Sequence, residues 1–461
     1  MNNFTDAYRS RLVSHEELVR GIKPGSLLWF GTWMGQAHGV MRALRQYGRG
    51  IDPLYVATSP ASAVGELLHE PNIQCVSTFL GIHERAARSE RHNVAYVPLQ
   101  FSDARKSIRV NRPDYVLVRV APMDARGYFN LSLTGGWAPH AIPWLTQHAP
   151  STRIVVEVNP HLPRIRGLEP FGNNEIHVAQ VTHIVEDDVP LPDYTTPEPT
   201  ETDRAIAANV AALVEDRATI QLGIGSIPMV IGRLLADRKG LGIHSEMFCQ
   251  SHLDLIEAGS VTNAHKGLYD GVSVATFALG EQRLYRWFTE HRDFAMLPVE
   301  DVNAVTVLAQ IRNMTSINSV LTVDFSGQAC SHCLGPQTYS GIGGAFEFVY
   351  GSQLSPGGKS ILCLPATKKL RDGSEVSNIV ARHPLGTRVS IPEHCVDWVV
   401  TEYGAVRLKF LDLERRAAAL IDLAHPRYRD ELARQAVANG LDLAVLARRR
   451  PPPEHFFSRG T

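Results

Sequence analysis

The chain has 461 residues, of which 44% are hydrophobic and 20% are charged, and its 46 basic and 47 acidic residues leave a formal net charge of −1. This composition is typical of a globular protein with more than one core, and the balanced charge gives no basic surface for nucleic acid. The sequence shows no signal peptide and no run of about 18 apolar residues, so we expect no membrane role and a cytoplasmic location.

Short apolar, β-branched runs in the first half predict strands that are buried on both faces. They are SLLWFG (26–31), LYVAT (54–58), VAYVPL (94–99), YVLVRVAP (115–122) and RIVVEVN (153–159). The segments between them are long enough for crossover helices, which indicates an α/β fold with a largely parallel sheet.

A Pro- and Thr-rich segment without periodicity, residues 189–203, predicts a linker between two domains. We therefore expect one domain over residues 1–195 and a second over residues 196–461. Each opens with a strand, a glycine-containing loop and a helix, near residues 27 and 220, which hints that the two domains are related.

The second half repeats the alternation of strands and helices and ends in a helical tail. The predicted strands are TIQLGIG (219–225), LGIHSE (241–246), FAMLPV (294–299), SVLTVDFSG (319–327), SILCLP (360–365) and WVVTEYG (398–404). Residues 410–435 predict helices, and RRRPPPEHFF (448–457) breaks the helical pattern.

Six cysteines in so long a chain are too sparse for a disulfide framework, so we expect them to be reduced. Cys330-Ser-His-Cys333 has the spacing of half a zinc knuckle, but no second close pair follows. We therefore predict no metal. The GGKS segment (357–360) is not a P-loop, because Gln353 occupies the position of its first glycine and a strand follows. Lys359 could contact a phosphate or could be a solvated lysine of a turn.

Two glycine-rich loops could expose backbone N–H groups to a ligand. GIGSIPMVIGRLL (223–235) joins a strand to a helix, where the turn could bind an anion or could be only a tight turn. Pro228 stands where a dinucleotide fingerprint needs its third glycine. YSGIGGAFEFVYG (339–351) has three glycines in four positions, which suits close approach of a ligand or a turn required by topology.

Glu246 lies at the end of a predicted buried strand, in GIHSEMF (242–248). It could be an ordinary, partly exposed or salt-bridged glutamate. It could instead be a nucleophile for an activated acyl group, with glycine-loop amides receiving the oxyanion.

In order along the chain, these segments resemble the acetyl-CoA hydrolase / 4-hydroxybutyrate CoA-transferase branch of the class I coenzyme A transferases. In the second half the resemblance runs through LGIGSIP, LGIHSEMF, DLIEAGSVTN, ATFALGEQRLYRW, NMTSINSVLTVDFSGQ, YSGIGGAFEF, GGKSILCLPAT, VVTEYGAVRL and ALIDLAHPRYRDEL. The first half is similar to the family in YVPLQFSD, DYVLVRVAPMDARGYFNLSL, VVEVNPHLPR and IHVAQVTHIVE.

This resemblance implies two α/β domains of the type shared by CoA-transferases and sugar-phosphate isomerases, with the active site between them. It assigns Glu246 as the catalytic glutamate, Asn318 in SINSV as a polar residue that helps hold the oxyanion, and Glu402 in VVTEYG as a supporting carboxylate.

The glycine loops take their roles from the same resemblance. Gly343 and Gly344 would turn their amides toward the thioester, and Gly223 and Gly225 would flank the other side of the carbonyl. Lys359 is a candidate for contact with a CoA phosphate.

The family resemblance also implies the ligands and the assembly. Coenzyme A is a substrate together with an acyl group and a small carboxylate acceptor, no further cofactor is needed, and a homo-oligomer is expected. The first glycine loop departs from the family pattern and reads FGTWMGQAHG (30–39), so Trp33 and Met34 would reshape the acyl pocket.

Three functions follow from these residues. The first is transfer of CoA from an acyl-CoA to a carboxylate through a glutamyl-CoA thioester on Glu246. The second is hydrolysis of an acyl-CoA with the same glutamate, and the third is an altered protein that only binds acyl-CoA.

Overall fold

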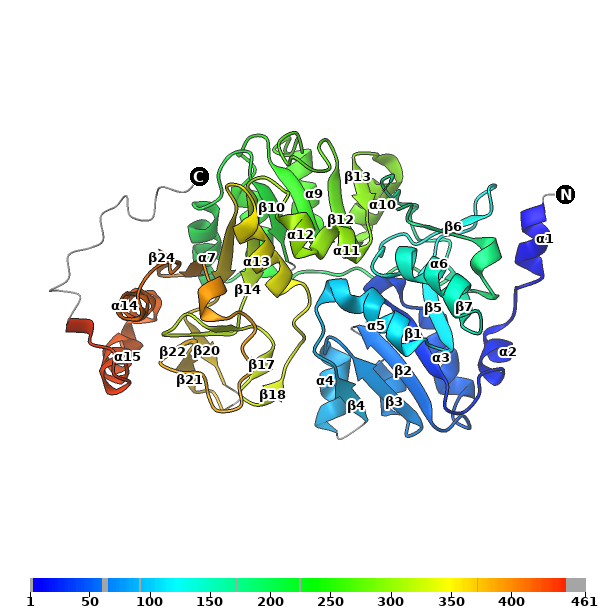
Figure 1. Cartoon of the computed structure of the whole chain (residues 1–461), viewed down its shortest axis with the longest axis horizontal. Coiled ribbons are helices and arrows are strands. Elements are labelled where there is room, and N and C mark those ends of the chain that lie inside the picture. The colour runs from blue at the N-terminus through cyan, green and yellow to red at the C-terminus, as the bar shows by residue number, and fades with distance from the viewer. Residues whose placement is uncertain are drawn as a thin grey trace.

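Two α/β halves make up the computed structural model, which describes residues 3–59, 65–90, 93–170, 172–223, 225–370 and 372–444. Figure 1 shows the first half in blue and cyan beside the second half in green and yellow. Each half has one large sheet with helices packed on it, and the carboxyl ends of several parallel strands point toward the other half.

The first half contains a sheet in which every registered pair of strands is parallel. Its strands lie in the order β4 (Val94–Tyr96), β3 (Ile73–Ser77), β2 (Leu54–Ser59), β1 (Leu27–Thr32), β5 (Tyr115–Val120), β7 (Arg153–Val158) and β9 (His183–Glu186). The helices are α1 (Asn3–Arg9), α2 (His15–Arg20), α3 (His38–Tyr47), α4 (Ile82–Ser89), α5 (Ala104–Asn111) and α6 (Ala138–His148), and β6 (Tyr128–Asn130) and β8 (Glu175–His177) form a small antiparallel sheet.

The second half contains a parallel sheet with one antiparallel strand, β24, at its edge. The order is β13 (Phe294–Met296), β12 (Ser273–Ala278), β11 (Gly242–Phe248), β10 (Thr219–Leu222), β14 (Met314–Ser319), β19 (Lys359–Cys363), β23 (Trp398–Thr401) and β24 (Gly404–Arg407). The helices are α7 (Glu201–Ala211), α8 (Ser226–Leu234), α9 (Gln250–Glu257), α10 (Gln282–Glu290), α11 (Val299–Asn303), α12 (Val305–Leu308), α13 (Ala345–Leu354), α14 (Leu413–Leu423) and α15 (Pro426–Ala438).

Both sheets follow the same strand order. Starting from β1 or β10, three successive strands are added on one side and the remaining parallel strands on the other. Parallel pairing requires a crossover connection each time, which explains why apolar strand segments alternate with helical ones in the sequence. The predicted α/β class with largely parallel sheets is confirmed, and the repeated order supports the relatedness of the two halves.

Several strands differ from the prediction. The segment 319–327 does not form one strand of the main sheet, because β14 ends at Ser319 and only β15 (Thr322–Asp324) follows, in a small separate sheet. Strands β3, β9, β12 and β14 were not predicted. β14 reads MTSINS, and its polar residues do not fit the apolar pattern expected of a buried strand, although it lies near the centre of the sheet.

Short strands inserted between β14, β19 and β23, together with two helices after β24, extend from the second sheet in Figure 1. The strands are β16 (Ala329–Cys330) and β22 (Ile379–Val380) beside β15, β17 (Cys333–Leu334) with β18 (Gln337–Thr338), and β20 (Thr367–Lys369) with β21 (Glu375–Ser377). Helices α14 and α15 confirm the predicted helical tail, whereas RRRPPPEHFF lies outside the described residues. All six cysteines are buried and free, as expected.

The two halves meet through backbone hydrogen bonds and an ion pair. The amides of Gly135 and Gly136 donate to the Thr276 carbonyl at 3.0 and 3.1 Å. Arg105 of α5 pairs with Glu300 of α11 at 2.5 Å. These contacts fix the carboxyl end of the second sheet against the first half.

The segment predicted as a linker, 189–203, crosses from one half to the other without helix or strand until α7 begins at Glu201. The expected domain boundary at 195/196 falls inside it. The segment is not loose, because Leu191 is buried and the Tyr194 amide donates to the Gly280 carbonyl at 2.9 Å.

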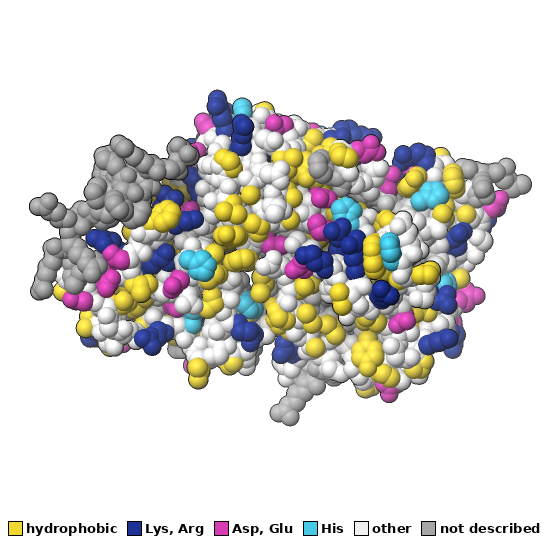
Figure 2. All heavy atoms as spheres, in the orientation of Figure 1, with side chains coloured by type: hydrophobic (Ala, Val, Ile, Leu, Met, Phe, Trp, Pro, Cys, Tyr) yellow, Lys and Arg dark blue, Asp and Glu magenta, His cyan; other side chains and the backbone are white. Residues whose placement is uncertain are grey.

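The surface agrees with the near-zero net charge. Figure 2 shows basic and acidic side chains interspersed over the visible face, with hydrophobic side chains exposed where the two halves meet. Of the helices in the described ranges, none is long and apolar enough to cross a membrane.

Candidate active site

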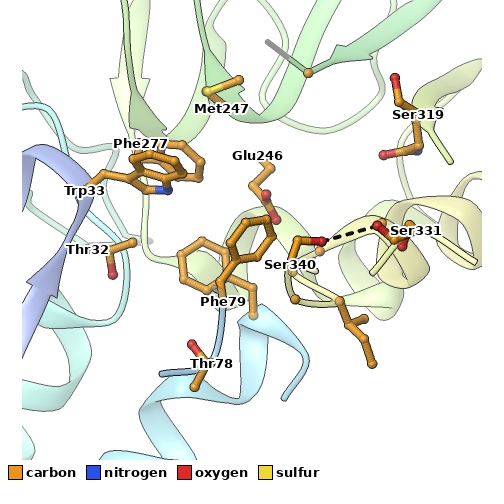
Figure 3. Close-up of a pocket in the computed structure, with 18 of the residues that line it drawn as sticks. Thr32, Trp33, Thr78, Phe79, Glu246, Met247, Phe277, Ser319, Ser331 and Ser340 are labelled. Carbon is orange, nitrogen blue, oxygen red and sulfur yellow. Dashed lines mark hydrogen bonds between the residues drawn. The ribbon is translucent and has the colours of Figure 1, made fainter. Parts of the chain in front are cut away.

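A cavity of about 270 Å³ lies between the two halves, at the carboxyl ends of β10, β11 and β14. Figure 3 shows the Glu246 carboxylate pointing into this cavity, with the rings of Trp33 and Phe277 on one side and Ser331 and Ser340 on the other. The cavity therefore lies between the two halves, where the site is expected, and Glu246 lines it.

Glu246 is half-buried near the end of β11 and is the carboxylate that faces the cavity. Its Oε2 atom accepts a hydrogen bond of 2.6 Å from the Asn303 side chain, at the end of α11. The backbone of Gly344, which caps the N-terminus of α13, provides a second hydrogen bond to this carboxylate. The partial positive charge of a helix N-terminus favours a carboxylate at this position.

A second carboxylate, Glu347, lies beside Glu246 and shares its amide partner. Asn303 Nδ2 is 3.3 Å from Glu347 Oε2, and Glu347 also accepts hydrogen bonds from the backbone N–H and the hydroxyl of Ser102. Ser102 belongs to the first half, so this pair of carboxylates joins the two halves.

Burial raises the pKa of Glu246 to about 7, against the smaller opposing effect of its hydrogen bonds from Asn303 and Gly344. Burial also raises the pKa of Glu347 to about 7, with repulsion from Glu246 adding to the effect. In the part of the chain that the structure describes, no Lys, Arg or His forms an ion pair with either carboxylate. Glu246 is therefore poised near neutrality, where a small change decides whether it is ionised.

Glycine is required at two positions of the predicted loop, at 344 because of space and at 343 because of the backbone conformation. A Cβ atom at position 344 would collide with Glu246 Oε2 and Asn303 Nδ2. Gly343 has φ +56°, a left-handed conformation that favours glycine. Both glycines line the cavity, as the sequence predicts for residues that face the ligand.

Asn318, predicted to hold an oxyanion, lines the cavity from β14. Its Nδ2 atom is buried and has no hydrogen-bond partner among the described residues, so an unpaired donor lies in the wall of the cavity. Of the two glycines that precede α8, Gly223 lines the cavity, whereas Gly225 does not and caps α8 instead.

Aromatic side chains form the wall that faces the first half. Trp33 stacks on Phe277 with 6.0 Å between ring centroids, and Phe101 packs edge-on against Phe277 at 6.1 Å. Trp33 lines the cavity, as predicted for an acyl pocket. Met34 does not, because its side chain turns into the main core and is 3% exposed.

Two predicted residues lie away from Glu246. Glu402 follows β23, four strands from β11, which at about 4.8 Å per strand is about 19 Å. Its carboxylate accepts the Ala366 amide at 2.9 Å. Lys359 opens β19 at the amino edge of the sheet, opposite to the cavity, and pairs with Glu215 at 2.8 Å. Neither residue contacts the reacting carboxylate.

The close-spaced cysteines do come together with a histidine. Potential ligand atoms of Cys330, His332 and Cys333 all lie within 4.8 Å of one another, and all three residues are buried. His332 Nδ1 is also 2.5 Å from the Ser390 hydroxyl. Three ligands are one fewer than a structural zinc site uses, so the prediction of no metal stays a prediction.

Asn303, Glu347 and Ser102 were missed by reasoning from the sequence. Glu347 lies inside the quoted glycine-loop segment, and its position in the first turn of a helix could have marked it. Asn303 and Ser102 carry no local pattern, because tertiary packing alone brings them to Glu246.

Comparison with known proteins finds similarity over nearly the whole chain and not only around this site. Residues 1–192 match the acetyl-CoA hydrolase/transferase N-terminal domain, and residues 280–436 match the C-terminal domain. A succinyl-CoA:cyclohexane-1-carboxylate CoA transferase from Geobacter metallireducens is 34% identical over 94% of this chain and 97% of its own. A 4-hydroxybutyrate coenzyme A transferase from Clostridium kluyveri is 34% identical over 93% of this chain and 97% of its own.

The fold comparison agrees. The crystal structure of RipA from Yersinia pestis superposes with a TM-score of 0.85 at 32% identity and covers 95% of this chain and all of its own. More distant similarity extends to acetyl-CoA hydrolases, such as that of Yarrowia lipolytica, which is 29% identical over half of this chain. The protein therefore belongs to the acetyl-CoA hydrolase/transferase family of enzymes.

Proposed function

We propose that this enzyme transfers coenzyme A from an acyl-CoA to a free carboxylate, with Glu246 as the nucleophile. The observation that carries the proposal is a carboxylate that lines a cavity beside an unpaired amide donor, has a pKa of about 7 and has no cation partner among the described residues. The relatives that cover nearly the whole chain and are named as CoA transferases support the same reaction.

In the first half-reaction, a Glu246 carboxylate oxygen attacks the thioester carbonyl carbon and the C–S bond breaks, which gives a mixed anhydride and CoA thiolate. The thiolate then attacks the Glu246 carbonyl carbon. The acyl group leaves as its carboxylate, and the enzyme retains a glutamyl-CoA thioester.

In the second half-reaction, an incoming carboxylate attacks the glutamyl thioester, which again gives an anhydride and CoA thiolate. Attack of the thiolate on the new acyl carbonyl gives the product acyl-CoA and restores Glu246. Because the first product leaves before the acceptor reacts, ping-pong kinetics are expected.

The surrounding residues suit these steps. The Asn318 side-chain amide has a free donor for the oxyanion that develops on the carbonyl oxygen. The absence of a cation beside Glu246 keeps the carboxylate reactive, since an ion pair would stabilise it before attack.

Hydrolysis is the second candidate, and the similarity to acetyl-CoA hydrolases favours it. The same glutamate would react, but water in place of a carboxylate would intercept the anhydride or the glutamyl thioester. The two functions differ only in what the second half-reaction accepts.

An experiment with acyl-CoA alone separates the candidates. The enzyme is incubated with butyryl-CoA without an acceptor and treated with borohydride, and its peptides are mapped by mass spectrometry. Reduction of Glu246 to the alcohol supports transfer, provided that less than one equivalent of CoA is released before the borohydride is added.

Steady release of CoA without an acceptor would instead establish hydrolysis. An unmodified Glu246 together with full turnover in acceptor-containing assays would refute the mechanism. A Glu402→Gln variant serves as the control, because that carboxylate lies far from Glu246 and should leave the trapping unchanged.

A further inference from the structure

A second cavity of about 240 Å³ lies inside the first half, between the central strands of its sheet and α5. It is lined by side chains of β1, β2 and β3 on one side and by Ala104, Ser107 and Asn111 on the other. These three residues are spaced three and four apart, so they form one face of α5.

The second cavity adjoins the cavity of Glu246. Thr32, Thr78, Leu99 and Phe101 line both. These four side chains form the boundary between the two spaces, and Phe101 also packs against Phe277 on the active-site side. The two cavities are therefore neighbours that these side chains separate.

The space over β1, the strand beneath the second cavity, is less completely packed than the space over β10, the corresponding strand of the second sheet. Leu27 and Trp29 on β1 alternate toward one face and keep accessible surface, although β1 is central in its sheet and α5 covers the space. On β10, which holds the same place in the second sheet, every residue is buried. Protein interiors are close-packed, so an open space of this size over a central strand indicates use by a ligand.

The walls of the second cavity are mainly apolar. Trp29, Phe30, Val76, Val97 and Trp137 surround it, and the half-buried Ser107 and the exposed Asn111 line it from α5 and add polar groups. An apolar cavity of about 150 Å³ is large enough to bind benzene, so this space can hold a six-membered ring or several methylene groups.

We propose that the second cavity receives the distal part of an apolar acyl group whose thioester lies at Glu246, and that the preferred substrates are medium-chain or alicyclic acyl-CoAs. This inference rests on the proposed function. The carbonyl end stays among Glu246, Asn318 and Gly344, while the hydrocarbon passes Thr32 and Phe101 into the chamber below α5.

The first test is a series of acyl-CoAs: acetyl, butyryl, hexanoyl, octanoyl and cyclohexanecarbonyl, with propionate as the common acceptor. We expect kcat/KM to increase about fourfold for each methylene added beyond butyryl, because each is removed from water. The cyclohexanecarbonyl arm shows whether a ring is accepted as well as a chain. A series that is flat or falls beyond butyryl would overturn the proposal.

The second test fills the chamber from α5. Ser107→Trp places a large side chain in it, and Val110→Trp places the same side chain on the solvent side of the same helix, where Val110 is 82% exposed. Ser107→Trp should lower kcat/KM for octanoyl-CoA at least tenfold and change that for acetyl-CoA less than twofold, whereas Val110→Trp should change neither. If Ser107→Trp does not fold, Ser107→Leu gives a smaller change with the same pattern. Equal loss for all acyl groups would overturn the proposal.

Calorimetric binding of the same acyl-CoAs separates the chamber from the reaction. Affinity that rises with chain length and falls in the Ser107 variant supports the chamber even without turnover, and the failure then lies with the proposed function. Turnover that is independent of chain length retains the function and rejects the chamber.

Discussion

The two halves have the same strand order but treat buried carboxylates in opposite ways. In the first half, Glu157 and Asp187 lie at the strand ends and face the buried guanidinium of Arg119, at 3.5 and 3.2 Å. All three side chains are at most 7% exposed, and Arg42 adds a second cation beside Asp187. The charges there neutralise one another.

In the second half, Glu246 and Glu347 face an amide and each other. Burial without a cation raises the pKa of both carboxyl groups to about 7, whereas the hydrogen bonds from Asn303 and Ser102 only moderate the effect. The fold supplies the position in both halves, but the partner decides whether a buried carboxylate is structural or reactive.

The largest effect is expected from Glu246→Gln. Loss of the proposed nucleophile should lower kcat at least about 10³-fold while the fold is retained, because an amide of the same shape keeps the Asn303 contact. Steady-state turnover of acyl-CoA with acetate measures this. Glu402→Gln is the matched control at another strand end and should stay within a few-fold of the wild type. Near-normal turnover of Glu246→Gln would mean that this carboxylate is not needed for the reaction, so that the two halves would not differ in function in this respect.

Arg119→Met tests the structural side. It leaves Glu157 and Asp187 buried without their guanidinium, so the free energy of unfolding should fall by about 3–5 kcal/mol. Urea denaturation measures the change. Arg126→Met removes an exposed pair with Asp124 and should cost less than about 1 kcal/mol. Similar values for the two variants would mean that the buried cluster does not need its cation.

The pH dependence sharpens the contrast further. Glu246 must be ionised to attack, so kcat/KM should rise with pH and level off above an apparent pKa near 7. Glu347→Gln removes a neighbouring carboxylate, which should lower that apparent pKa and raise activity at pH 6. A profile that is flat from pH 5.5 to 8, or an upward shift in the variant, would contradict the arrangement of two coupled carboxylates.

The smallest effect is expected from metal removal. The proposed steps use Glu246 and CoA alone, so dialysis against a chelator should leave turnover unchanged, and elemental analysis should find no stoichiometric metal. A loss of activity restored by zinc would point to Cys330, His332 and Cys333, whose ligand atoms lie within 4.8 Å of one another.

The sequence predicts the sheets well where strands are continuous apolar runs. β5 and β10 fall within predicted segments, because their residues are buried on both faces. β14 escapes this reasoning, since MTSINS is buried through small polar residues whose hydroxyls find partners only in the folded protein, as Ser316 does with Ser352.

The site is predictable only as far as local pattern and family resemblance extend. Glu246, Asn318, Gly343 and Gly344 converge on one cavity as predicted. Glu402 and Lys359 do not, because strand order and strand direction place them at a distant strand and at the opposite edge. Neither property can be read from the spacing of residues along the chain.

The contact between Ser102 of the first half and Glu347 of the second half links the packing of the two halves to the number of protons that the protein binds. With the halves together, Glu246 and Glu347 are shielded from water and hold protons near pH 7. If the halves separated, water would reach both groups, their pKa values would fall toward those of ordinary glutamates, and protons would be released at neutral pH. A closing of the two halves over these groups would therefore bind protons, and lower pH would favour the closed arrangement.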